Sequence, residues 1–185
     1  MILLAAIALG LALVPLSGGT FRKLSRADFH APVLLPIALA LQTLPSVALR
    51  VTDVARAEAL TVVCWTAGAA VLLLVCWRNW HLHGMRIVAL GVVCNAVVIL
   101  LNRGMPVGMD ALRLLGDVEG ALRFLSESPL YQLESELTRL LVLADVMPLP
   151  GPPSVRAVVS LGDLLLFSGV LVSIVQSGST RLADV

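Results

Sequence analysis

The sequence predicts an all-α integral membrane protein, a bundle of about five transmembrane helices with short amphipathic helices in a long outer loop. Hydrophobic residues make up 58% of the 185 residues and charged residues 14%, whereas soluble domains have about 45–50% and about 25%. The mean hydropathy is +0.96. Several apolar segments approach the roughly 17–25 residues that a helix needs to cross a bilayer. We expect one polytopic membrane domain that covers the whole chain.

Five segments are the expected spans, and each must be helical because lipid offers no hydrogen-bond partner to the backbone. They are residues 1–16, 31–49, 57–77, 85–101 and 157–175. The first segment lacks the preceding basic residues and the small-residue cleavage site of a signal peptide. We therefore expect it to be an uncleaved anchor.

The distribution of charge predicts the orientation, because Lys and Arg concentrate in cytoplasmic loops. Basic residues follow the first span, at Arg22, Lys23 and Arg26, and the third span, at Arg78 and Arg86. The segment 102–154 has an excess of acidic residues. The chain is thus expected in the plasma (inner) membrane with its N-terminus outside and its C-terminus in the cytoplasm. The net charge of +1 gives no indication of nucleic acid binding.

The outer segment 102–154 is expected to be structured. Residues 109–115 predict a short helix that ends at Gly116, and residues 117–125 predict another turn or two. Ser128 and Pro129 are typical of a helix start. An amphipathic helix is predicted from there to Ala144, because apolar residues recur at helical spacing. The prolines at 148, 150, 152 and 153 predict an extended connection to the last span.

Polar residues near the outer ends of the last two spans form the candidate site, since such residues are costly in a membrane. Asp163 is expected about two turns inside the last span, with Arg103 as its charge partner and Asn102 as a hydrogen-bond donor. Helix capping is the alternative role for these residues. The candidate ligand-binding residues are Asn102, Arg103, Met105, Asp145, Ser160 and Asp163, and second-tier candidates are Gln42 and Asn95.

No pattern in the sequence predicts catalytic residues, a cofactor or a metal centre. Phosphate-binding loops, nucleophile elbows and zinc-protease motifs are lacking. His30, His81 and His83 have loose spacing and no acidic or cysteine ligand beside them, so a metal site is not expected. The three cysteines lie in apolar runs and do not predict a disulfide framework.

The motifs resemble those of a known family. They are Gly18-Gly19, Gln42, Asn95, the run from Asn102 through Arg103, Gly104, Met105 and Pro106 to Val107, Asp145, and the run from Ser160 to Asp163. The chain resembles the bacterial membrane-protein family called domain of unknown function 5317 over nearly its whole length. A second glycine is common in that family at the position of Arg103. The resemblance implies the membrane architecture and the choice of pocket, and it implies no reaction.

The leading hypothesis is a non-enzymatic protein whose outer polar pocket binds a small ligand, an ion or a partner. Expected partners are membrane lipids and either another membrane protein or further copies of the chain. The first alternative is an oligomeric transporter or channel subunit, with a path lined by polar residues at several depths. The second is an intramembrane enzyme that acts on a lipid-linked substrate, with Asp145 and Asp163 as an acid/base pair.

Overall fold

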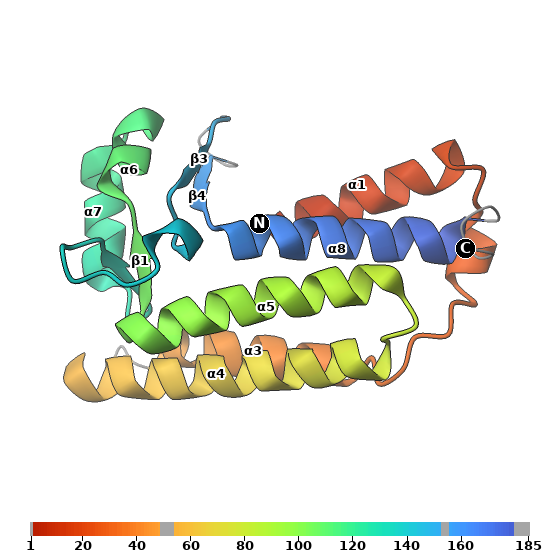
Figure 1. The fold of residues 1–185 in the computed structure, drawn as a ribbon, viewed down its shortest axis with the longest axis horizontal. Helices are drawn as coiled ribbons and strands as arrows, with labels where there is room; N and C mark the ends of the chain where they lie inside the picture. Colours follow the sequence, from red (N-terminus) through yellow and green to blue (C-terminus); the bar gives the residue numbers. More distant parts are fainter. Residues whose placement is uncertain (1, 49–53, 153–155, 180–185) are drawn as a thin grey trace.

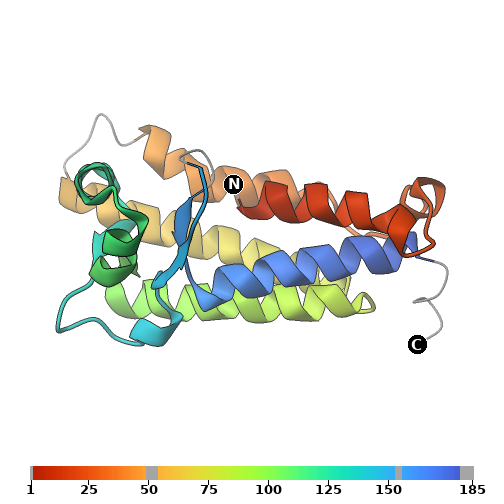
Figure 2. The ribbon, with the colours of Figure 1, turned by 90° about the horizontal axis from the view of Figure 1, so that it is seen from above.

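The protein is a bundle of helices that carries a small mixed cap at one end. The computed structural model describes residues 2–48, 54–152 and 156–179. Five long helices run lengthwise beside one another (Figures 1 and 2). They are α1 (Ile2–Leu16), α3 (Leu34–Ala48), α4 (Val54–Arg78), α5 (His83–Asn102) and α8 (Leu161–Gly178), and the short α2 (Phe21–Leu24) follows α1.

Three helices in the described residues are long and apolar enough to cross a membrane. They are the stretch Glu58–Arg78 of α4, all of α5 and all of α8, whereas α1 and α3 contain shorter apolar stretches. The predicted helical class is therefore confirmed, together with three candidate spans. Residue 1 of the first expected span and residue 49 of the second lie outside the described residues.

Helices α5 and α8 lie close together because glycines face one another across the contact. A Cβ atom on Gly91 would lie 2.6 Å from the carbonyl oxygen of Gly162, and one on Gly169 would lie 2.7 Å from that of Gly84. Both distances are too short for any side chain. Small residues that allow backbones to approach are a common way to join membrane helices, where the hydrophobic effect gives little help.

The cap, defined here as residues 103–152 and 156–159, covers the end of the bundle at which α5 ends and α8 begins (Figure 1). Its strand β1 (Met105–Val107) pairs in parallel with β2 (Tyr131–Leu133), and β3 (Met147–Leu149) pairs in antiparallel fashion with β4 (Ala157–Val159). Helices α6 (Met109–Leu115) and α7 (Val118–Glu127) connect the first pair.

The helix expected at 109–115 is confirmed, and it ends at Gly116 with a positive φ of 85°. Asp117 caps α7 by accepting from the Gly120 N–H.

The amphipathic helix predicted from Ser128 to Ala144 is wrong. Ser128 Oγ does accept the N–H groups of Leu130 and Tyr131, as a cap would. The chain then extends as β2, because β1 offers it backbone partners, with the Met105 N–H donating to the Leu130 carbonyl at 2.7 Å. Only the 3-10 turn η2 (Leu141–Leu143) forms later in this stretch.

The last helix also starts later than the sequence predicted, which was at residue 157. Residues 157–159 form β4, and α8 begins at Leu161. Ser160 and Asp163 form a capping box, in which each side chain accepts the other residue's backbone N–H. Asp163 therefore lies in the first turn of α8 instead of two turns inside it. The expected extended connection is seen in β3, which contains Pro148, whereas Pro153 lies outside the described residues.

Candidate functional site

A closed polar network joins the first turn of α8 to the middle of α5. Asn95 Nδ2 donates to Asp163 Oδ1 at 2.9 Å, and Ser160 Oγ donates to Asn95 Oδ1 at 3.0 Å. The second carboxylate oxygen of Asp163 accepts the Ser160 N–H at 3.1 Å. Glycine at 162 makes room for this network, because a Cβ there would overlap Asn95 Oδ1. Asn95 and Ser160 therefore hold the Asp163 side chain, whereas the sequence predicted Arg103 as its partner.

Asp145 is positioned by strand β1 of the cap. Its backbone N–H donates to the Pro106 carbonyl at 3.0 Å, and its carbonyl accepts the Gly108 N–H at 2.8 Å. Strand β1 therefore lies between β2 on one side and Asp145 on the other. Pro106 fits this position because it lacks an N–H, and its carbonyl is the group that Asp145 uses. The backbone thus fixes the position of Asp145 within the cap.

The side chain of Asp145 is buried within the cap. The residue is 5% exposed, and among the described residues its Oδ1 has no hydrogen-bond partner. Burial, together with a smaller contribution from the charge of Asp163, raises the pKa of this carboxyl to about 8. A buried acceptor without a donor is unfavourable by about 1–3 kcal/mol. Asp145 therefore favours an occupant that supplies a donor.

Tyr131 adds a third polar side chain next to the two carboxyl groups. It lies in β2 opposite Met105, and its ring contacts Phe124 with the ring centres 5.8 Å apart. Burial raises the pKa of Tyr131 to about 12, and the charges of Asp145 and Asp163 contribute. The hydroxyl therefore stays protonated at neutral pH and can donate a hydrogen bond.

A long cavity of about 1260 Å³ connects this region with the opposite end of the bundle. Its wall includes Leu24 and Phe29 near α2 and Leu115 and Phe124 in the cap. Most of its lining is aliphatic or aromatic. The polar and charged lining residues are Gln42, Asp117, Tyr131, Asp145, Arg156, Asp163, Ser173 and Ser177. Arg156 lies 3.6 Å from Asp117 in an ion pair at the cap end.

A smaller cavity of about 220 Å³ lies between the cap and α3, α4, α5 and α8. Asn95 and Met105 line it, whereas Asn102, Arg103 and Ser160 line neither cavity. Both cavities share six lining residues, and we call the four polar ones the junction. The junction consists of Gln42, Tyr131, Asp145 and Asp163.

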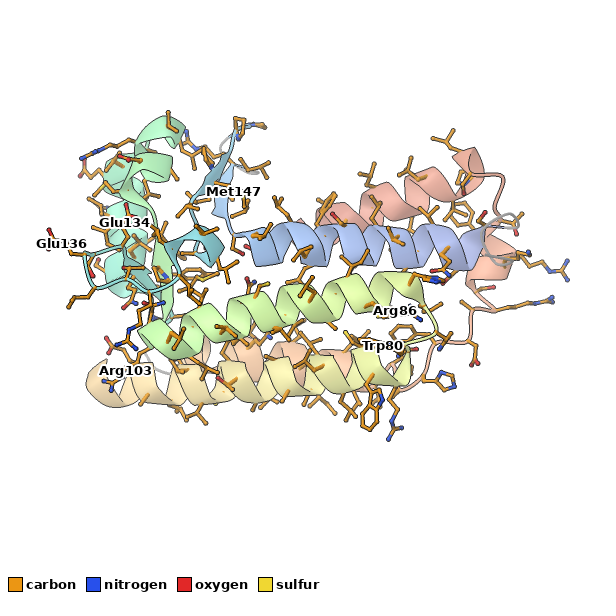
Figure 3. The ribbon with its side chains drawn as sticks, in the orientation of Figure 1. Trp80, Arg86, Arg103, Glu134, Glu136 and Met147 are labelled. Atoms are coloured by element: carbon orange, nitrogen blue, oxygen red, sulfur yellow. The ribbon has the colours of Figure 1, made fainter. Side chains whose placement is uncertain are left out.

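Asn102 holds the cap in place instead of facing the cavities. Its Oδ1 accepts the Arg139 N–H at 2.8 Å, and its Nδ2 donates to the carbonyls of Arg139 and Val98. Arg103 ends α5 with a φ of 58°, and its side chain is exposed. Figure 3 shows Arg103 at the cap end, far from Trp80 and Arg86 at the other end.

Sequence reasoning missed Tyr131 and Arg156 as cavity residues, and it missed Asn79. Asn79 repeats the Asn102 arrangement at the opposite end. Its Oδ1 accepts the His30 N–H at 2.7 Å, and its Nδ2 donates to the carbonyls of His30 and Val75. An asparagine at or just after the end of α4 and α5 was the available signal, and the loop that it binds cannot be read from the sequence.

The fold and the cavities define a class of protein: a bundle with three helices able to span a membrane and a largely apolar cavity with acidic groups under its cap. Residues 26–175 match the model of the family of unknown function (DUF5317), so the chain belongs to this family. The family resemblance seen in the motifs is thereby confirmed. No curated protein and no solved structure matches the chain.

Proposed function

We propose that the protein crosses the plasma membrane five times, with the cap outside and the α2 end in the cytoplasm. Helices α1 and α3 lie alongside the three long helices (Figure 2). Each has 15 residues, about 22 Å at about 1.5 Å per residue. This is shorter than a bilayer core of about 30 Å. Local thinning of the bilayer accommodates such a mismatch at modest cost.

The orientation is supported by the basic residues at the α2 end. Arg22 and Lys23 lie in α2, and Arg86 lies at the start of α5, where its guanidinium is 5.9 Å from the Trp80 ring centre. Single cysteines test the topology in a variant whose native cysteines are replaced by alanine. A membrane-impermeant thiol reagent should label Leu137→Cys in intact cells and Lys23→Cys only after permeabilisation. The reverse pattern would contradict the orientation.

The function that the site supports best is binding of an amphiphilic ligand, without chemistry. The observation that carries this proposal is the long cavity, which is apolar over most of its length and polar at the junction. Its volume exceeds the roughly 300–1,000 Å³ of ordinary ligand pockets. A hydrocarbon chain fits the apolar part, because burying each CH₂ group contributes about 0.8 kcal/mol. A polar head would then lie at the junction.

Native mass spectrometry of protein purified from its own membrane tests this proposal. Val170 lines the long cavity, whereas Val172 on the same helix does not, and it is 38% exposed. We expect a bound lipid-like mass on the wild type and on Val172→Trp and its loss from Val170→Trp. Equal retention by both variants would refute binding in the cavity.

A transporter is the second candidate, because the cavity extends from the cap to residues near α2. Ser173 and Ser177 place polar groups in its wall toward the α2 end of α8. Ligand flux across liposomes, absent in Val170→Trp, would favour this candidate over binding alone. The enzyme alternative gains less support, because both oxygens of Asp163 accept hydrogen bonds within the protein.

A further inference from the structure

The junction indicates which head group the ligand carries. Of its four polar side chains, two are carboxyl groups, and Gln42 and Tyr131 are neutral amide and phenol groups. The two other charged residues of the long cavity, Asp117 and Arg156, form an ion pair with each other at the cap end. Among the described residues, Arg156 is the basic side chain of the lining, and it is paired with Asp117, so the junction has an acidic excess.

The two carboxyl groups differ in how far the protein satisfies them. Asp163 has a partner for each oxygen, Asn95 for one and the Ser160 N–H for the other. Asp145 Oδ1 has none among the described residues, although the side chain is buried and lines both cavities. Buried carboxylates are normally paired with a charge or a hydrogen-bond donor. An occupant with a positively charged or donating head would complete the site.

We propose that the ligand is a cationic amphiphile, a long-chain amine or ammonium compound, whose head binds Asp145 beside Asp163 and whose chain occupies the long cavity. This inference rests on the ligand-binding function proposed above. A phosphate or sulfate head is disfavoured, because it would meet two carboxyl groups and an arginine that is already paired. A cationic head also stabilises the ionised form of Asp145, so binding releases a proton from that residue.

Binding should therefore strengthen as pH rises and Asp145 loses its proton. The titratable and charged groups around the two cavities, besides Asp145, are Cys76, Asp117, Tyr131, Arg156 and Asp163. Tyr131 is held protonated, since its pKa is raised to about 12. A quaternary ammonium head keeps its charge at every pH, so a pH effect on its binding must come from the titration of groups in the protein.

The test uses full-length protein in nanodiscs of zwitterionic lipid with one of three probes of equal chain length. The probes are hexadecyltrimethylammonium, hexadecanol and hexadecyl phosphate, and bound probe is measured by native mass spectrometry. We expect the ammonium probe to bind at least about tenfold more tightly than the other two, equivalent to about 1.4 kcal/mol. The preference over hexadecanol, whose head does not titrate in this range, should grow between pH 6 and pH 9, the interval that contains the Asp145 pKa of about 8.

Variants separate the head group from the chain. Asp145→Asn keeps the shape of the side chain, so it should bind hexadecanol as before and lose the ammonium preference. Asp110→Asn makes the same substitution at an exposed side chain of the cap and should keep that preference. Equal binding of all three probes to the wild type, or tighter binding of the phosphate, would overturn the cationic head and leave ligand binding intact. Failure of every probe to bind would overturn both proposals.

Discussion

Replacing Asp145 by asparagine should stabilise the ligand-free protein, and the gain should depend on pH. The buried carboxyl has a pKa of about 8 instead of its ordinary 3.8. The native state therefore binds one more proton than the unfolded state between roughly pH 4 and pH 8. The stability from this group is fully present below pH 4 and is lost as pH rises through about 8.

The size of the effect follows from the same two pKa values. Each pH unit between them corresponds to about 1.4 kcal/mol, so the ionised carboxylate above pH 8 is unfavourable by on the order of 5 kcal/mol. An asparagine side chain cannot ionise, so the Asp145→Asn protein does not bury a charge at high pH. It still buries a neutral amide in the same place.

Thermal unfolding in one detergent at pH 5, 7 and 9 measures this difference. The Tm of Asp145→Asn should exceed that of the wild type by a margin that widens with pH. Asp110→Asn, at an exposed carboxyl group that forms an ion pair with Arg113, serves as the charge control and should follow the wild type. Parallel pH profiles for the wild type and Asp145→Asn would refute the assignment of a buried protonated carboxyl.

Three further substitutions, two of them paired with a control variant, test the structure of the bundle and the cap. Ser160→Ala removes the cap of α8 and a partner of Asn95, and it should lower the free energy of unfolding by about 1–2 kcal/mol; no change would contradict the capping box. Gly91→Ala places a Cβ 2.6 Å from the Gly162 carbonyl and should cost about 1–3 kcal/mol. Gly10→Ala, whose Cβ has side-chain atoms of Ile174 at 3.1 Å as its three nearest neighbours, should cost less, and the opposite order would refute the close contact of α5 and α8. Asn102→Ala should increase protease cleavage of the cap near Arg139, whereas Arg103→Ala should leave it unchanged, and equal cleavage would refute the role of Asn102.

The long helices could be predicted because apolar runs in lipid have only one favourable backbone conformation. The bounds expected for α5, 85–101, differ from the observed His83–Asn102 by two residues at one end and one at the other. The end of α6 was predicted correctly from Gly116, because glycine readily takes a positive φ. The start of α8 was also readable, since Ser160 and Asp163 have the spacing of a capping box. The apolar strand β4 just before it obscured that signal.

The cap could not be predicted in the same way. Strands of three residues are too short to show an alternating pattern, and β2 forms only because β1 lies beside it. The apolar residues from Leu130 to Ala144 have helical spacing, yet Leu137 is 88% exposed. The burial of Asp145 also depends on its pairing with Pro106, 39 positions earlier in the chain. That its Oδ1 has no hydrogen-bond partner among the described residues follows from the folded structure and not from any local pattern.

An experimental structure of the protein, extracted from its own membrane directly into nanodiscs, would test ligand binding at the junction most directly. The expected result is elongated density in the long cavity, with its head within hydrogen-bond distance of Asp145 Oδ1 and its chain directed toward α2. A structure in which α3 and α8 close over the cavity, with no density and with a protein donor on Asp145 Oδ1, would contradict the account.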